Sequence, residues 1–289
     1  MSTQEQEPAT QEQEPPETES PGDRRRAEKQ RRLAADRQAE AEAATTTDEE
    51  TVLLKVFRYD PEVEDKQEPR FDDFHVPYED GMTVLDALIY ARDTFDSSLT
   101  FRHSCRQAIC GSDALFVNGS QRLACKTQLS DLDAPVRVEP LPHQDVVKDL
   151  VVDMEHFYDQ MHAVEPYFQS DDLPEGDLEE QRQSRENREK VKMSTRCIWC
   201  GACTSSCNIA AGDNQYLGPA AINKAYRFTM DEREADKKEH RLRILEQEHG
   251  VWRCQTQFSC TEVCPKDIPL TEHIQELKRE AVKKNLKFW

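Results

Sequence analysis

The sequence predicts an α+β protein with two folded domains, the first built on a β-sheet and the second mostly helical. The 289 residues are enough for two domains that each bury a core. Short strand-like stretches dominate residues 51–145, and apolar residues spaced three or four apart dominate residues 146–289. The ten cysteines are concentrated in three stretches, which places candidate ligand sites in both domains.

The first 50 residues are predicted to be disordered. They are rich in Glu, Gln, Pro and Thr and contain almost no aromatic or branched apolar residue, so they cannot bury enough surface to order themselves. One short charged helix is expected there, around residues 24–42. The segment has neither a basic start nor an apolar stretch, so no secretory signal is predicted.

The formal net charge of −19 makes nucleic acid an unexpected partner, because so acidic a surface repels polyanions. The first 50 residues contain fourteen acidic and seven basic side chains, so the excess of acid extends over the rest of the chain. A high-salt cytoplasm is one setting that suits such charge, and ordinary acidity is the alternative. No run of about 18 apolar residues is present, and the chain is not expected to span a membrane unaided.

Residues 51–145 predict a small sheet that encloses one helix. The helix is expected over residues 83–95, with Thr83 and Asp86 in a capping-box pattern. Asn118-Gly119 is a hairpin turn signal between two short apolar runs. The predicted strands are residues 51–59, residues 71–78, the two halves of residues 114–125, and residues 135–140.

The second domain is predicted to place its cysteine loops between helices. Residues 145–161 have apolar positions three and four apart, and a solvated connection follows over residues 169–187. Further helices are expected from Pro219 to about Glu234 and near residues 237–248. Thr271 can cap a last helix, whose basic end suits either an anionic membrane surface or the helix dipole.

Cysteines without a secretory signal favour metal ligation or redox chemistry over disulfides, although their even number leaves disulfides as a weaker alternative. The first set has the spacing of a plant-type [2Fe–2S] site, C-x4-C-x2-C with a distant fourth cysteine. Cys105 and Cys110 form the first pair, Asp113 occupies the third position, and Cys125 is the distant residue. A carboxylate can bind iron and favours the ferric state. The alternative is that Asp113 is a solvated turn residue beside an incomplete site.

Two further sets follow the bacterial run C-x2-C-x2-C-x3-C. The first of these runs is complete and consists of Cys197, Cys200, Cys203 and Cys207, with Asn208 in place of the usual proline. The second run has Gln257 where its second cysteine should be, and consists of Cys254, Cys260 and Cys264, followed by Pro265.

In two-cluster ferredoxins the fourth cysteine of each run binds the other run's cluster. The same crossing here predicts a [4Fe–4S] cluster on Cys197, Cys200, Cys203 and Cys264. It leaves three thiolates for the other centre, which predicts a [3Fe–4S] cluster on Cys207, Cys254 and Cys260. Structural zinc is the alternative, but tetrahedral zinc uses two cysteine pairs rather than seven cysteines in interleaved runs.

These motifs resemble those of the iron–sulfur subunit of succinate dehydrogenase (respiratory complex II) and fumarate reductase. The resemblance covers about residues 51–289 and includes the segments FRHSCRQAICGSD, YLGPAAINKAYRF and WRCQTQFSCTEVCPKDIPL. It implies a plant-type ferredoxin (β-grasp) domain over residues 51–145 and a helical, bacterial-ferredoxin-like domain over residues 146–289. The Asp113 variant of the first motif also occurs in this family.

The resemblance implies an electron-transfer subunit of succinate dehydrogenase (quinone), in the citric acid cycle and respiratory chain, rather than the site of succinate oxidation. Electrons from FAD on a flavoprotein subunit would pass through the three clusters to a quinone held by membrane-anchor subunits, at the cytoplasmic face of the cell membrane. Fumarate reductase and another flavin-linked oxidoreductase are the alternatives. After Cys207 the chain lacks the proline and tryptophans of many ubiquinone-using relatives, so no quinone contacts are carried over.

Overall fold

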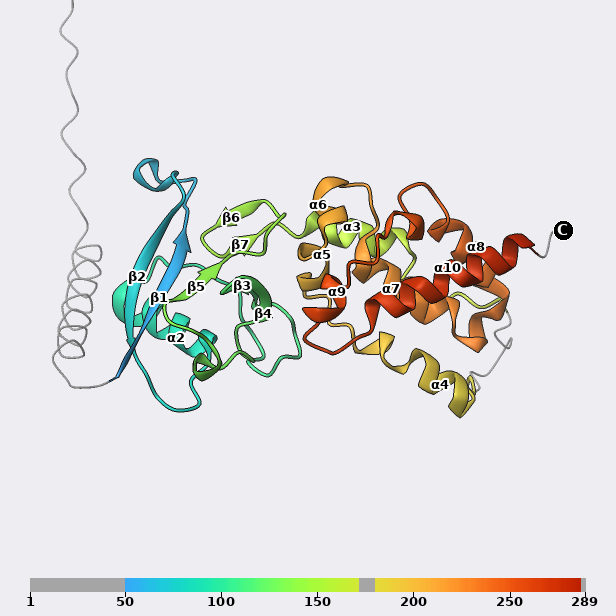
Figure 1. Cartoon of the computed structure of the whole chain (residues 1–289), viewed down its shortest axis with the longest axis horizontal. Coiled ribbons are helices and arrows are strands. Elements are labelled where there is room, and N and C mark those ends of the chain that lie inside the picture. The colour runs from blue at the N-terminus through green and yellow to red at the C-terminus, as the bar shows by residue number, and fades with distance from the viewer. Residues whose placement is uncertain (1–49, 172–179, 287–289) are drawn as a thin grey trace, which may run out of the picture. The chain divides into compact units, whose positions relative to one another are not determined.

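The fold combines a mixed β-sheet with a helical region, as the sequence predicts (Figure 1). The computed structural model describes residues 50–171 and 180–286. The predicted tail, apart from Glu50, and its charged helix lie outside these residues. Within the described ranges no helix is long and apolar enough to cross a membrane.

The sheet has five strands in the order β2-β1-β5-β3-β4. Strand β1 pairs antiparallel with β2 and parallel with β5, and β3 pairs antiparallel with both β4 and β5. The predicted strands and the hairpin at Asn118-Gly119 are confirmed. Their bounds are β1 Thr51–Arg58, β2 Arg70–Pro77, β3 Ala114–Val117, β4 Ser120–Leu123 and β5 Val136–Glu139.

Helix α2 (Val84–Tyr90) continues into a π-helical turn, Ala91–Phe95, and together they match the predicted helix. The capping box is also confirmed, because the Thr83 side chain accepts from the Asp86 N–H and the Asp86 carboxylate accepts from the Thr83 N–H. Apolar side chains of α2 pack on those of the sheet and form the core of the domain. Burial of this apolar face holds the short helix in place.

The helix predicted over residues 145–161 is wrong in its first half. Residues there form a two-stranded hairpin of β6 (Val146–Lys148) and β7 (Val151–Val152), and helix α3 begins only at Glu155 and ends at Ala163. Asp149 turns the chain at positive φ, 45°. The valines of this segment also favour a strand, since branched side chains lose rotamer freedom in a helix.

The helical region is arranged around α7 (Gly218–Thr229), which is buried over most of its length and contacts α3, α8 and α10 (Figure 1). It ends before the predicted Glu234 because Asp231 caps a separate 3-10 segment. The last helix begins at Leu270, so Thr271 is inside it rather than capping it. The remaining helices are α4 Arg185–Lys192, α5 Ala202–Ser205, α6 Asn208–Gly212, α8 Lys238–Leu245, α9 Ser259–Glu262 and α10 Leu270–Leu286.

A buried arginine joins three parts of the sheet domain. Arg58, at the end of β1, is 2% exposed and donates to Asp149 Oδ1 at 3.1 Å and to Asp96 Oδ2 at 2.7 Å. Asp149 is equally buried and also accepts from the N–H groups of Tyr59 and Thr100. Arg58 and Asp149, with the groups that they bind, form a buried hub. This hub fixes the turn of the β6–β7 hairpin and Thr100, which precedes the first cysteine loop.

Replacing Arg58 by Met is expected to lower the free energy of unfolding by about 3–5 kcal/mol, because Asp149 would remain buried without its positive partner. A denaturant titration followed by circular dichroism measures the change. Lys55, on the same strand, forms an exposed ion pair with Asp73 at 2.8 Å and provides the matched control. Lys55→Met is expected to cost less than about 1 kcal/mol, and equal losses in the two variants would contradict the role of the hub.

Candidate metal centres

The first cysteine loop surrounds its sulfurs with backbone N–H groups. The sulfur of Cys105 accepts from Gln107 and Ile109, both at 3.4 Å, and from Cys110 at 3.2 Å. The N–H of Ala108 points at the sulfur of Cys125, at 3.3 Å. These donors, the N–H of Gln107 first among them, lower the pKa of the Cys105 thiol to about 7. The loop thus favours the thiolate form that binds iron.

Asp113 faces the same site and is not solvated. It is 2% exposed, and its Oδ2 accepts from the N–H of Cys125 at 2.6 Å. Its Oδ1 is buried and has no hydrogen-bond partner among the residues that the structure describes. Burial, and then the contact with Asp113, raise the pKa of the Cys125 thiol to about 12. A positive ion between the two groups would satisfy Oδ1 and stabilise both anions, so the donor set fits an iron centre.

The second and third cysteine loops repeat one backbone pattern. A 3-10 turn leads into Cys197, positive φ angles follow at Trp199 and Gly201, and helix α5 begins. In the third loop a 3-10 turn leads into Cys254, positive φ angles follow at Thr256 and Phe258, and helix α9 begins. Cys200 lies between the two positive-φ residues of its loop, Trp199 and Gly201. Gln257 lies in the same way between Thr256 and Phe258. Gln257 is therefore the structural counterpart of Cys200.

The structure brings the seven cysteines of these loops into two groups. The first group lines one pocket and consists of Cys197, Cys200, Cys203 and Cys264. Burial first, and then the neighbouring cysteines, raise the pKa of the Cys200 thiol to about 12 and that of the Cys203 thiol well above its ordinary value. Thiols in such surroundings ionise only when positive charge is bound among them, which an iron cluster provides.

The second group meets around the buried side chain of Tyr216. Burial raises the pKa of this phenol first, and the thiols of Cys254, Cys207 and Cys260 raise it further. In the described part of the chain, no three Cys, His, Asp or Glu side chains converge on a point suited to one metal ion. In a [4Fe–4S] or [3Fe–4S] cluster each thiolate binds a different iron atom, so such convergence is not required for the helical centres.

The first and second cysteine loops are in direct contact. A Cβ placed on Gly111, where φ is +72°, would lie 2.8 Å from the Cβ of Cys200. A second link reaches the third loop. Lys126, which follows Cys125, donates from Nζ to the carbonyl of Pro265, which follows Cys264, at 3.2 Å. Only a residue without a side chain allows the first approach, so Gly111 sets how close the two loops lie.

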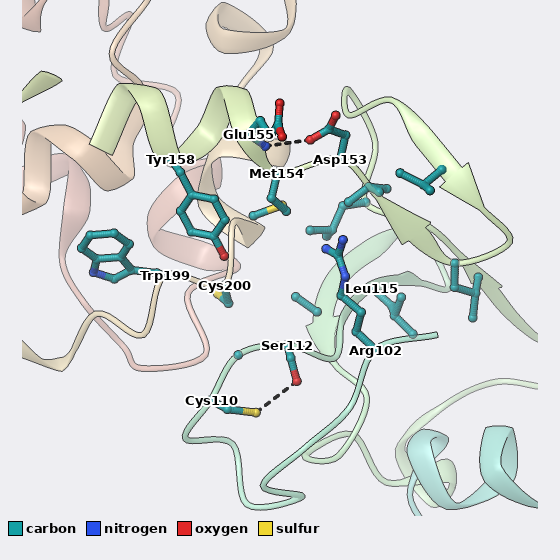
Figure 2. A pocket seen from close by; sticks show the side chains of 16 residues that line it. Arg102, Cys110, Ser112, Leu115, Asp153, Met154, Glu155, Tyr158, Trp199 and Cys200 are labelled. Atoms are coloured by element: carbon teal, nitrogen blue, oxygen red, sulfur yellow. Dashed lines mark hydrogen bonds between the residues drawn. The ribbon is translucent and has the colours of Figure 1, made fainter. Parts of the chain in front are cut away.

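Beside this contact lies a pocket of about 520 Å³ between the sheet and the helical region. Figure 2 shows Cys110 and Ser112 on one side of it, and Cys200 with Trp199 on the other. The Ser112 hydroxyl is 3.2 Å from the Cys110 sulfur. Two predicted ligands from different loops therefore line one pocket.

Three polar side chains near the helical cysteines were not predicted from the sequence. The Thr271 hydroxyl lies 3.6 Å from the Cys260 sulfur. Tyr216 is buried beside the second group of cysteines, and Asn223 is fully buried on α7. Asn223 gives the clearest signal in retrospect, because it is a polar residue in a helix that is otherwise apolar on its inner side. The other two positions depend on tertiary packing.

Two family models match the chain. Residues 53–159 match a 2Fe-2S iron-sulfur cluster binding domain, and residues 193–268 match a 4Fe-4S dicluster domain. The first match contains the first cysteine set, and the second contains all seven cysteines of the other two sets. The positions of the two predicted cluster regions thus agree with the matched models.

Relatives cover most of the chain. The fumarate reductase iron-sulfur subunit of Haemophilus influenzae is 37% identical over 240 residues, which are 80% of this chain and 93% of the relative. A second relative is the mitochondrial succinate dehydrogenase (ubiquinone) iron-sulfur subunit 1 of Oryza sativa subsp. japonica. It is 38% identical over 231 residues, which are 79% of this chain and 82% of the relative. A chain of the Mycobacterium smegmatis Sdh1 complex, solved in the apo form, superposes with a TM-score of 0.70 at 26% identity, covering 82% of this chain and 97% of that one.

Removing the Asp113 carboxylate is expected to abolish or loosen the first centre. In Asp113→Ala the EPR signal of the reduced [2Fe–2S] cluster should be lost, whereas Asp113→Cys should retain it with an altered potential, because a thiolate replaces the oxygen ligand. Ser112→Ala is the neighbouring control and should retain the cluster, since Ser112 only hydrogen-bonds to a predicted ligand. An Ala variant with an unaltered signal would show that Asp113 is no ligand.

Proposed function

Because the chain belongs to the family of iron–sulfur subunits of succinate dehydrogenase and fumarate reductase, we propose that it is the electron-transfer subunit of a succinate dehydrogenase. Electron transfer in an oxidoreductase complex is the family's common role, and this chain shares it. Its use for succinate oxidation with a quinone as acceptor is the proposal. It is supported most by the relative named succinate dehydrogenase, which is 38% identical over 231 residues, and by the three cysteine sets that lie within the matched 2Fe-2S and 4Fe-4S domains.

The proposed ligands of the [2Fe–2S] cluster are Cys105, Cys110, Asp113 and Cys125. Those of the [4Fe–4S] cluster are Cys197, Cys200, Cys203 and Cys264. The third centre is proposed as [3Fe–4S] on Cys207, Cys254 and Cys260, because its loop has an exposed glutamine, Gln257, at the position that corresponds to Cys200. The proposed domain division at residues 145 and 146 lies within the first family match.

When bound, the clusters supply one-electron transfer between the FAD of a flavoprotein subunit and a quinone. The residues of this chain set the conditions for that transfer. Backbone N–H groups around Cys105 stabilise its thiolate, and Gly111 holds the first two cysteine loops together. Burial of Cys203 and Cys260 excludes water from the helical centres, which tunes their potentials.

The proposed partners are a flavoprotein subunit and membrane-anchor subunits that hold the quinone. The proposed location is the cytoplasmic face of the cell membrane, with this chain as a peripheral member of the complex. Affinity purification of the full chain from its native membranes tests both. Retention of a flavin-containing subunit and of hydrophobic subunits is expected, and recovery of the chain without a flavoprotein would contradict the proposed assembly.

Fumarate reductase is the second candidate, since relatives with that name and relatives named succinate dehydrogenase are almost equally similar. The purified complex is expected to oxidise succinate with a quinone faster than it reduces fumarate with the corresponding quinol. Steady-state rates in both directions, with matched substrate concentrations, measure the ratio. A faster fumarate reduction would support the second candidate.

Gln257→Cys is expected to convert the third centre from [3Fe–4S] towards [4Fe–4S] by supplying a fourth thiolate. The EPR signal of the air-oxidised complex should then decrease, because oxidised [3Fe–4S] is paramagnetic and oxidised [4Fe–4S] is not. Quinone reduction should also become slower, since the converted cluster has a lower potential.

Gln255→Cys is the matched control for this variant. Gln255 is also an exposed glutamine of the third loop, but it lies outside the position that corresponds to Cys200. The control should keep its [3Fe–4S] signal. An unchanged signal in Gln257→Cys, or equal conversion in both variants, would contradict the ligand assignment.

A further inference from the structure

One face of helix α10 holds the third cysteine loop at two points. Near the start of the helix, the Thr271 hydroxyl lies 3.6 Å from the Cys260 sulfur. One turn further along, Gln275 Nε2 donates to Thr256 Oγ1 at 2.9 Å. Thr271 and Gln275 are four positions apart, so they lie on the same side of the helix. Of the two contacts, the one made by Thr271 ends on the sulfur of a predicted ligand.

Thr271 belongs to a chain of hydrogen bonds that begins at its own backbone. Its N–H donates to Oγ1 of Thr261, a residue of helix α9, at 3.0 Å. The hydroxyl oxygens of Thr261 and Thr271 are 2.9 Å apart. Thr271 is 2% exposed and Cys260 is 8% exposed, so water has little access to the contact between them. A buried hydroxyl is costly without partners, so these contacts determine how the Thr271 hydroxyl is oriented.

The direction of each hydrogen bond follows from the groups that form it. The Thr271 N–H can only donate, so Thr261 Oγ1 accepts from it. A cysteine that binds iron has lost its proton, so the Thr271 hydroxyl is the donor at the contact with Cys260. A hydroxyl carries one proton, so Thr271 Oγ1 must accept at its contact with Thr261. The reverse arrangement would turn an oxygen lone pair of Thr271 towards the negative sulfur.

We propose that the Thr271 hydroxyl donates a hydrogen bond to the Cys260 thiolate of the third centre and raises its reduction potential, and that Thr261 is the positioning residue that keeps this hydroxyl turned towards the sulfur. The inference rests on the ligand assignment in the proposed function. Hydrogen bonds to sulfur are among the factors that set cluster potentials. A donor stabilises the reduced state most, because that state carries more negative charge, and burial strengthens the effect.

The test is a redox titration of the purified complex, with the EPR signal of each cluster recorded against applied potential. Thr271→Val removes the hydroxyl but keeps the branched shape of the side chain, and is expected to lower the midpoint potential of the [3Fe–4S] cluster. Thr271→Ser keeps the hydroxyl and should retain most of that potential. The [2Fe–2S] and [4Fe–4S] potentials should stay unchanged and serve as internal references. An unchanged [3Fe–4S] potential in Thr271→Val, or an equal decrease in both variants, would overturn the inference.

Thr261→Val tests the positioning role in the same titration. It removes the proton that Thr271 Oγ1 accepts, so the Thr271 hydroxyl can turn away from the sulfur, and a smaller decrease in the [3Fe–4S] potential is expected. The double variant Thr261→Val with Thr271→Val should have the potential of Thr271→Val alone, because Thr261 acts through Thr271. No shift in Thr261→Val, or additive shifts in the double variant, would contradict the role of Thr261.

Thr256→Val is the matched control. The Thr256 hydroxyl also joins the third loop to α10, through Gln275, but in the described part of the chain it does not hydrogen-bond to a cysteine sulfur. The same change of threonine to valine therefore removes a link of the same kind without removing a donor to sulfur. Its [3Fe–4S] potential should be unaltered. A decrease equal to that of Thr271→Val would show that the position of the loop, and not the hydrogen bond to Cys260, sets the potential.

A measurement on the unaltered complex keeps the test independent of variant folding. Of the three proposed clusters only [3Fe–4S] is paramagnetic in the air-oxidised complex, so pulsed EPR then reports on the third centre alone. Complex prepared in D₂O should show a coupling from the deuterated Thr271 hydroxyl, which Thr271→Ser should retain and Thr271→Val should lack. Absence of any exchangeable coupling while the cluster signal is present would overturn the inference alone. Absence of any [3Fe–4S] signal from the complex would instead contradict the proposed function.

Discussion

The close approach of Gly111 to Cys200 is the constraint on which the arrangement of the centres depends. The two residues belong to different cysteine loops, and there is no room between them for even one methyl group. The rest of the structure supports this contact. The Lys126–Pro265 hydrogen bond links the segment after Cys125 to the third cysteine loop, and Ser205 Oγ donates to the carbonyl of Pro142 at 2.9 Å. Electron transfer needs short distances between centres, and the Gly111–Cys200 contact brings two predicted ligand loops together.

Buried charge fixes segments of the chain in both the sheet domain and the helical region. Arg58 and Asp149 anchor the chain just before the first cysteine loop. In the helical region Arg241 is 1% exposed and pairs with the fully buried Glu234, while its guanidinium also donates to the carbonyls of Glu165 and Tyr167. Each arginine satisfies several acceptors at once, which makes its burial tolerable and fixes segments that have little apolar surface of their own.

The core of the helical region contains two of the predicted ligands. Cys203 and Cys260 lie in one apolar cluster with residues of α7 and α10, and the other cysteines of the two loops pack at its edge. Cys207 of the second loop lies with the cysteines of the third loop, and Cys264 of the third loop lies with those of the second. The positions of the two loops therefore depend on each other. In the second group the Thr271 hydroxyl lies 3.6 Å from the Cys260 sulfur, and the buried Tyr216 packs beside the same group.

Local spacing and short-range propensity were enough to predict the fold class, the strands, the capped helix α2 and the grouping of the cysteines into three sets. The prediction from sequence failed in the first half of residues 145–161, where the burial of Asp149 against Arg58 accompanies a hairpin in place of the predicted helix. Only long-range packing buries Asp113 with one unpaired oxygen, places Gly111 against Cys200, and brings His273 Nδ1 to 2.8 Å from the Asn223 amide oxygen. Each of these joins residues distant in the chain, and no local pattern encodes which side chains packing will bring together.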